Sequence, residues 1–292
     1  MPTKSSVAVF VPALLLFVAS GTASAQQSPS LSGLGSDVTC DFKYLANNVI
    51  MDGEDVVTSP FYVTSPDSLL RSPKFYLVLG TAGAVFGGSF ALDQTMRSHL
   101  GGMSSSDADL LQDVSYGSVS AATVLLYGYG LWNDDDRARE YAITAGEGAG
   151  IASLIDVGTK AGFGRLRPSQ TGSHTAFFRG GQSFVSGDVT PMFALAAGVS
   201  EYYDNRWYVA APVYSLALLD GFGRMGNNAH WFSDVAGAAL LGIGTTELFI
   251  YLHKQHNQEP SRWRIFPISG PPGQLSQNRV SYAAGMSVSY SW

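Results

Sequence analysis

Three short blocks of the chain carry the residue types that bind and transfer an oxyanion. In the first, Lys160 and Arg167 lie seven residues apart, about two helical turns, so a helix ending before Pro168 would place both cations on one face. Arginine offers a fork of N–H donors and lysine a point charge, which together suit a tetrahedral oxyanion. Alone, the pair is weak evidence of a site, because Asp156, one turn before Lys160, can simply pair with it.

The second block, residues 183–188, reads Ser-Phe-Val-Ser-Gly-Asp and stands just before an apolar segment that predicts a helix. Gly187 lets backbone N–H groups approach an anion closely, and a helix N-terminus adds partial positive charge. The hydroxyl of Ser186 can donate a further hydrogen bond. An ordinary helix cap made by Ser186 or Asp188 remains the simpler interpretation of this block taken alone.

The third block is the most specific. Gly223 and Arg224 are followed, after five residues, by His230, and Asp234 lies four residues further on. At this spacing on a helix the carboxylate can hold one imidazole nitrogen and turn the other toward a reacting atom, as around a catalytic histidine. A structural His–Asp pair has the same spacing, but Arg224 in so apolar a region indicates a bound anion.

Together the blocks resemble the three signatures of the type 2 phosphatidic acid phosphatase and vanadium haloperoxidase superfamily. The family pattern is K-x6-R-P, then P-S-G-H, then S-R-x5-H-x3-D. The first signature is complete from Lys160 to Pro168, and the third is complete from Arg224 to Asp234, with Gly223 in place of the serine. The resemblance extends over about residues 75–252.

This resemblance implies an exported phosphatase that hydrolyses phosphomonoesters or diphosphates without a metal or other cofactor. His230 would attack phosphorus and form a phosphohistidine, and Asp234 would orient its ring. The substrate phosphate would be bound by Lys160, Arg167, Ser186, Gly187 and Arg224. These cations would stabilise charge on the equatorial oxygens in place of a metal.

The second signature departs from the family at its last position, where Asp188 replaces the histidine, and Val185 replaces the proline. In the family that histidine is understood to protonate the leaving oxygen. Asp188 can do so only when protonated, and neighbouring cations and a bound phosphate act on its pKa in opposite directions. Alternatively Asp188 stays ionised and the enzyme favours good leaving groups, or His174 supplies the proton.

Two other functions remain open. A vanadate-dependent haloperoxidase uses the same kind of pocket, although Asp188 and the short chain do not favour it. A catalytically weakened phosphate-binding protein is the other alternative, and it rests on Asp188. The expected partner is a phosphorylated small molecule or lipid, with association to a membrane surface as an option, and the sequence does not fix the oligomeric state.

The elements that must position these blocks are helical. Long uncharged segments at 75–92 and 114–132 predict buried helices. Each is long enough to span a bilayer, but we favour a water-soluble bundle over a membrane-spanning one. The run Asp134–Asp136 predicts an N-terminal cap for a helix over 137–163, and further helices are expected at 187–203, 207–220 and 230–252. We therefore predict an all-α fold, a bundle of about six helices.

After Pro260 the alternation of apolar and polar residues predicts a short C-terminal β-hairpin appendage, 262–268 with 279–292, around a Gly-Pro-Pro-Gly turn. The expected division is therefore a signal peptide over 1–25, a leader with an amphipathic helix over 26–73, a phosphatase bundle over 74–257 and the hairpin over 258–292. The helix of the leader is expected at 41–57.

The first 25 residues combine Lys4, an apolar run and a terminal Ala-Ser-Ala, which predicts a cleaved export signal and a periplasmic location.

The net charge of the chain is −6 with no basic block, which excludes the electrostatic footprint of a nucleic-acid binder. The single cysteine, Cys40, cannot form an intramolecular disulfide. With 46% hydrophobic and 14% charged residues, the chain has the composition for an extensive core.

Overall fold

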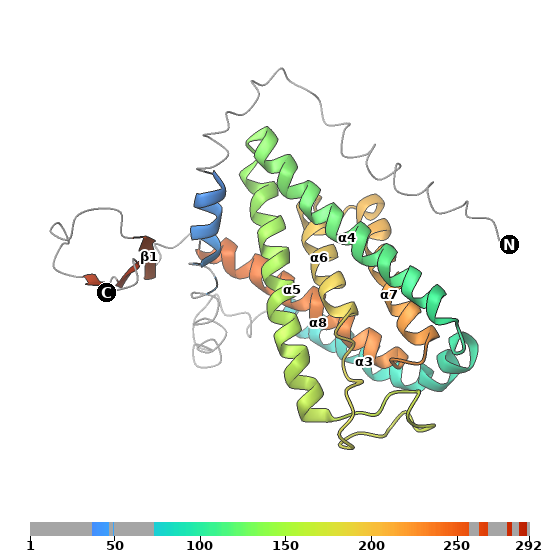
Figure 1. Cartoon of the computed structure of the whole chain (residues 1–292). Coiled ribbons are helices and arrows are strands. Elements are labelled where there is room, and N and C mark those ends of the chain that lie inside the picture. Colours follow the sequence, from blue (N-terminus) through green and yellow to red (C-terminus); the bar gives the residue numbers. More distant parts are fainter. Residues whose placement is uncertain are drawn as a thin grey trace.

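The computed structural model describes residues 37–46, 49, 73–256, 263–267, 279–281 and 286–290. The bundle in this part of the chain consists of α3 (Pro73–Leu100), α4 (Ser105–Asn133), α5 (Asp136–Phe163), α6 (Val189–Tyr202), α7 (Trp207–Gly226) and α8 (Phe232–His256). A short helix over 37–46 precedes it. The prediction of a helical bundle is confirmed (Figure 1). The expected signal peptide lies outside the described residues, as does the leader apart from 37–46, 49 and 73.

The helix boundaries follow from local capping. Asp135 accepts a hydrogen bond from the Ala138 amide at 3.0 Å, and Asp134 closes α4 in the left-handed conformation with φ 55°. The acidic run is therefore a cap, as predicted. At the other end of α5, Gly164 takes φ 50° and its amide bonds to the Lys160 carbonyl, which stops the helix.

Helix α6 lies at the centre of the bundle and packs on α4, α5, α7 and α8 (Figure 1). Ten of its 14 residues are buried, and small residues such as Ala and Gly recur along it. Close approach depends on glycine: a Cβ on Gly198 would come within 3.0 Å of the Tyr141 carbonyl on α5. Gly242 of α8 is equally tight, because its Cβ would lie 2.9 Å from the Ala194 amide.

Helix α3 is far less covered. Its residues from Tyr76 to Leu79 are 56–70% exposed. Only 11% of its most apolar 18-residue stretch is buried. The prediction of a buried helix over 75–92 is therefore wrong, because an uncharged segment has the same composition whether it faces a core or lies on the outside. The prediction for 114–132 holds on one face only: Val119 and Leu126 are buried, whereas Val124 is 68% exposed.

Two helices, Tyr76–Leu100 within α3 and Phe232–Lys254 within α8, are long and apolar enough to cross a membrane by length and composition. The core helix of a soluble protein can have the same length and composition. Helix α8 is the more buried of the two, with 39% of its most apolar stretch covered. These two helices are the structural features that bear on a membrane location.

In the C-terminal region, strands β1 (Trp263–Pro267), β2 (Arg279–Ser281) and β3 (Met286–Tyr290) pair antiparallel in the order β1-β3-β2. The strand β1 pairs with β3, so that Trp263 lies opposite Tyr290. The predicted hairpin stays a prediction, because residues 268–278, which would form its turn, lie outside the described residues.

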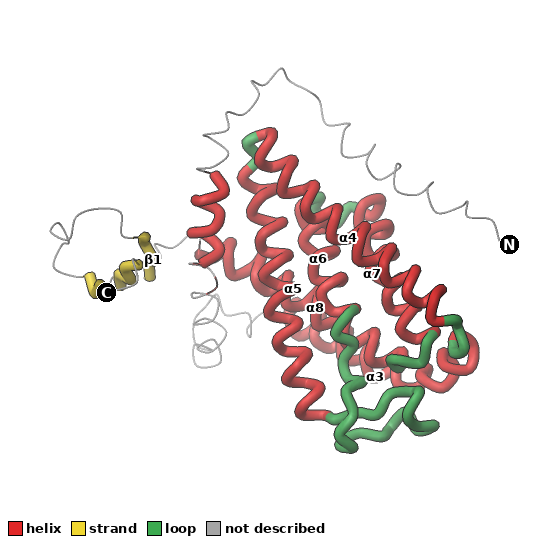
Figure 2. Tube along the Cα trace, viewed as in Figure 1, coloured by secondary structure: helices red, strands yellow, loops and turns green. Residues whose placement is uncertain are grey.

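The long connection between α5 and α6, residues 164–188, is irregular and runs across one end of the bundle (Figure 2). Three contacts from α3 hold it. Arg97 donates to the carbonyls of Pro168 at 2.7 Å and Thr171 at 3.0 Å, and Gln94 donates to the Gly172 carbonyl at 2.7 Å. The first two sequence blocks lie at the two ends of this connection, and the third lies at the turn from α7 to α8.

Candidate active site

His230 lies in the connection that joins α7 to α8 and is 3% exposed. Its amide and that of Ala229 both bond to the Arg224 carbonyl, at 3.2 and 3.0 Å, which wraps the turn around the end of α7. The ring nitrogen Nδ1 is 2.7 Å from the carbonyl oxygen of Ser183. Because a carbonyl only accepts, this contact assigns the proton of the neutral ring to Nδ1 and leaves a lone pair on Nε2.

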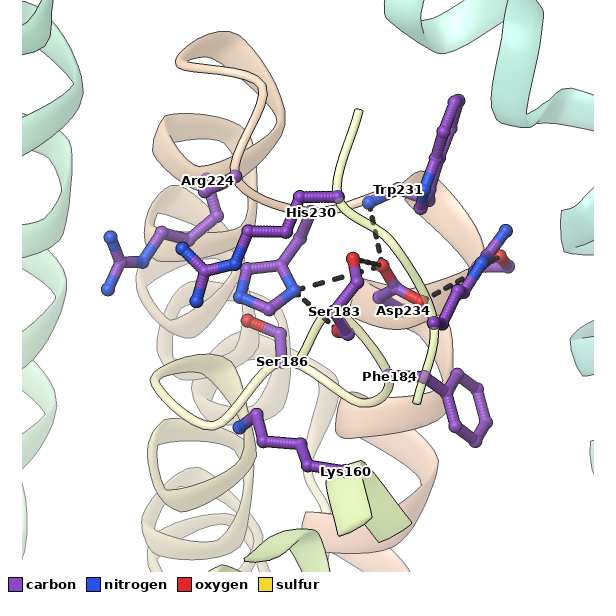
Figure 3. Close-up of polar contacts among 12 residues, drawn as sticks. Lys160, Ser183, Phe184, Ser186, Arg224, His230, Trp231 and Asp234 are labelled. Carbon is purple, nitrogen blue, oxygen red and sulfur yellow. Dashed lines mark hydrogen bonds and ion pairs between the residues drawn. The ribbon is translucent and has the colours of Figure 1, made fainter. Parts of the chain in front are cut away.

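Asp234 approaches His230 but does not hold it directly. Its Oδ2 atom is 3.8 Å from Nδ1, longer than a hydrogen bond. The carboxylate instead accepts from the Ser183 hydroxyl at 2.5 Å and from the Trp231 amide at 2.9 Å. Asp234 thus fixes Ser183, and the Ser183 carbonyl orients the ring (Figure 3).

Arg165 is a residue of this site that the sequence reasoning missed. It is 0% exposed and bridges two carboxylates, Asp93 of α3 at 2.6 Å and Asp234 of α8 at 2.5 Å. It also donates to the Ser233 hydroxyl at 2.7 Å. The rings of Phe90, Phe177 and Trp231 pack around its guanidinium. A fully buried guanidinium needs opposite charges and hydrogen-bond acceptors, and the two carboxylates and the Ser233 hydroxyl provide them.

A signal for this network was present in the sequence. Asp93 is the first charge after the uncharged residues 75–92, and Arg165 stands in an equally apolar environment two residues before Arg167. A lone charge that follows an apolar segment either forms an ion pair or is exposed to water. The partner could not be named, because Asp93 and Arg165 are 72 residues apart.

Lys160 lies in the last turn of α5, where its Nζ atom is 2.5 Å from Oδ2 of Asp156. Its amine also lies against the end of the second block, because a Cβ on Gly187 would come 2.5 Å from Nζ. The glycine therefore leaves the space that the amine occupies. The pairing with Asp156 that the sequence allowed is therefore found, together with a contact to the second block.

Arg167 is not on the helix that carries Lys160. The expectation that both project from one helical face is wrong, because Gly164 ends α5 and reverses the chain. The turn that contains Arg167 instead packs on the α7–α8 connection. Trp231 Nε1 donates to the Leu166 carbonyl at 2.9 Å. The Ser169 amide donates to the Asn228 carbonyl at 3.1 Å. Within the described ranges, the Arg167 guanidinium has no carboxylate in ion-pair distance.

Ser186 is fully buried, and its Oγ atom has no hydrogen-bond partner among the described residues. Figure 3 shows its hydroxyl beneath the His230 ring, with Lys160 below and Arg224 to one side. The amide of Ser186 donates to the Asp234 carbonyl at 3.3 Å, which ties the second block to α8. An unpartnered buried hydroxyl beside an imidazole is a free donor for a ligand.

Asp188 stands at the start of α6 without capping it, since its side chain makes no cap hydrogen bond. Its carboxylate forms an ion pair with Arg224 and accepts from the Tyr116 hydroxyl of α4 at 3.4 Å. Arg224 also approaches Asp220, one turn earlier on α7, with 3.8 Å between Nε and Oδ1. The residue that replaces the family histidine thus neutralises one of the expected phosphate-binding cations.

His174, the alternative proton donor, lies in the connection between α5 and α6 and is half-buried. Its Nδ1 is 3.4 Å from the side-chain nitrogen of Gln94, and its ring packs edge-on against Trp231. The ring of His174 therefore contacts α3 and Trp231. In the part of the chain that the structure describes, no group of three or more His, Cys, Asp or Glu residues is arranged to hold a metal.

Residues 141–258 match the PAP2 superfamily. Over these residues the chain is similar to members of that superfamily. It is also 30% identical over 137 residues to a lipid A 1-phosphatase of Porphyromonas gingivalis. The aligned region covers 46% of this chain and 28% of that relative, so the chain spans well under a third of the length of the relative. No solved structure matches the chain.

Proposed function

We propose that the protein is an exported phosphatase that transfers the phosphoryl group of a phosphomonoester or diphosphate to His230 and then to water. The observation that carries this proposal is the orientation of the ring. Nδ1–H is bound to the Ser183 carbonyl, so the nucleophilic lone pair of Nε2 faces the side occupied by Ser186 (Figure 3). A neutral imidazole fixed in one tautomer is the form that can attack phosphorus.

In this mechanism Nε2 of His230 forms a bond to phosphorus as the bond to the leaving oxygen breaks. Water then attacks the phosphohistidine and releases phosphate. The negative charge on the equatorial oxygens is stabilised by Lys160, Arg167 and Arg224, with the Ser186 hydroxyl and the Gly187 amide as further donors. We propose that these donors replace a metal ion.

Asp188 decides how the leaving oxygen receives its proton. Its carboxylate forms an ion pair with Arg224. If it stays ionised in the complex, substrates with good leaving groups, such as aryl esters or pyrophosphate, are favoured over alkyl phosphates. If Asp188 takes up a proton from solvent when the phosphate binds, it is the acid and the rate rises toward acidic pH. Paired aryl and alkyl phosphates distinguish the two, because equal rates contradict an ionised Asp188.

We further propose a phosphorylated lipid as the substrate and a membrane surface as the place of action. Two observations support this choice over small soluble phosphates. The relative in P. gingivalis is a lipid A 1-phosphatase. In addition, α3 exposes Leu77 at 70% and Val78 at 67%, and α5 exposes Leu154 at 69%, which are apolar contacts that an acyl-chain environment would bury. The predicted signal peptide over 1–25 supports export to the periplasm.

The test is to trap the phosphoenzyme. The mature chain, from residue 26, is mixed briefly with a phosphate-labelled substrate and quenched in alkali, where phosphohistidine survives. We expect label on the wild type and none on His230→Ala, with turnover lost as well. His174→Ala is the matched control and is expected to keep the label, because its ring contacts Gln94 and Trp231 rather than His230. Undiminished turnover by His230→Ala excludes the proposal, and phosphate binding without turnover by the wild type identifies a binding protein.

The lipid substrate is tested separately. Release of phosphate from a long-chain lipid phosphate in vesicles is compared with release from a short-chain soluble ester of the same headgroup. We expect the vesicle substrate to be favoured at least tenfold in kcat/KM. Equal values would assign the enzyme to soluble phosphates.

A further inference from the structure

We propose that Asp220 regulates the phosphate site by taking up a proton from solvent when a tetrahedral anion binds Arg224. The inference rests on the proposed function only in needing that anion site. Asp220 makes no bond to phosphorus and is a positioning residue, because it acts through the charge and position of the Arg224 guanidinium.

The geometry of Asp220 is unusual for a carboxylate. The residue is 0% exposed, and neither of its oxygens has a hydrogen-bond partner among the described residues. It lies one turn before Arg224 on α7, with 3.8 Å between Oδ1 and Nε, and that Nε is likewise buried and unpartnered. Such a carboxylate is costly to keep ionised in this position.

The charges around Arg224 do not balance. Its guanidinium lies between Asp220 of α7 and Asp188 at the start of α6, so one positive charge faces two carboxylates. The remaining titratable neighbour is Tyr116 of α4, a donor to Asp188 that adds no positive charge. Within the described residues, no titratable group of α3 or α8 acts on the pKa of Asp220. A phosphate that binds Arg224 would be a third anion on this one cation.

Protonation of one carboxylate removes this excess of negative charge. Burial, and then the charge of Asp188, raise the pKa of Asp220 to about 7, against the opposing effect of Arg224. The pKa of Asp220 therefore lies near neutral pH, where the carboxyl can gain or lose a proton. An arriving dianion raises this pKa further, since like charge disfavours the ionised carboxyl. One proton from solvent then converts the carboxylate to a carboxylic acid, and no other bond changes.

Sulfate is the probe that isolates this effect, because it is a tetrahedral dianion that does not titrate near neutral pH. Its affinity for the mature wild-type chain is measured by calorimetry from about pH 5.5 to about pH 8.5. Above pH 7 we expect the affinity to fall by up to about tenfold per pH unit more than in Asp220→Asn, because binding requires the extra proton. Asp204→Asn, which alters an exposed carboxylate on the α6–α7 turn, is the control expected to behave as wild type.

The calorimetric heats in buffers of different ionisation enthalpy give a second measurement. We expect the wild type to take up a fraction of a proton per sulfate at about pH 7 through Asp220, and Asp220→Asn to take up correspondingly less. Equal proton uptake in both proteins, or equal pH slopes, overturns the inference and assigns the effect to another group such as His230. Absence of sulfate and phosphate binding at every pH overturns the anion site itself, and with it the proposed function. If Asp220→Asn does not fold, zero proton uptake by the wild type alone still refutes the proposal.

Discussion

Substitution of Gly187 by alanine is expected to disable the site without unfolding the protein. The added Cβ would lie 2.5 Å from Nζ of Lys160 and 2.7 Å from Oδ2 of Asp156, well inside van der Waals contact. The atom that gives way is the far end of a flexible lysine, so the amine moves by about 1 Å or more. The φ angle of Gly187 is not in the left-handed region, so the backbone accepts the alanine.

The magnitude follows from what Lys160 contributes to the bound phosphate. A hydrogen bond from a charged donor is worth about 1.5–3 kcal/mol, and about 1.4 kcal/mol corresponds to a factor of ten. We therefore expect kcat/KM for an aryl phosphate to fall by about 10-fold to about 150-fold in Gly187→Ala. Thermal unfolding should change little, because the contact is made by a side-chain end at the edge of the core.

A double-mutant cycle with Lys160→Ala gives the decisive assay. If the alanine acts by displacing the amine, Gly187→Ala should have little further effect in the Lys160→Ala background. Gly158→Ala is the matched control, since Gly158 lies on α5 and an added Cβ has nothing within 4 Å. Equal losses in both backgrounds would falsify this reasoning and indicate that the Gly187 backbone, rather than the space for the lysine, is what matters.

Three further predictions follow from the buried charges. Replacing Arg165 by leucine leaves Asp93 and Asp234 buried without their counter-charge. It should lower the free energy of unfolding by about 3–5 kcal/mol in denaturant titrations. Adding Asp93→Asn should restore part of this free energy, and no restoration would contradict a charge effect. Asp188→His, which restores the acid of the family, should raise turnover of alkyl phosphates by about tenfold or more relative to aryl phosphates; a uniform change across both classes would argue against Asp188 as the missing acid. Because burial raises the pKa of Asp220 from 3.8 to about 7, the folded protein holds a proton that the unfolded chain lacks between these values, so its stability falls as pH rises through that window. Asp220→Asn should flatten this fall, by up to about 4 kcal/mol, in unfolding midpoints measured across the window.

The sequence by itself determined the local features of this protein. The uncharged segments and the acidic cap at Asp135 predicted the main helices, because capping and hydrophobic length act within a few residues of the chain. The third block was expected at the start of a helix over 230–252, but Arg224 lies in the last turn of α7 and His230 lies in the connection before α8 begins at Phe232. The uncharged composition at 75–92 did not reveal whether this helix was covered, since that depends on neighbours elsewhere in the chain.

Only the tertiary structure decided how the ring of His230 is held and which charges meet. The i, i+4 rule pointed to Asp234, yet the ring is bound by the carbonyl of Ser183, a backbone atom 47 residues away that no side-chain pattern marks. Likewise, Arg165 finds Asp93 across 72 residues, and Arg224 finds Asp188 across 36. Such pairs are set by the packing of whole helices around α6, because burial forces each charge to take whatever opposite charge the fold brings beside it.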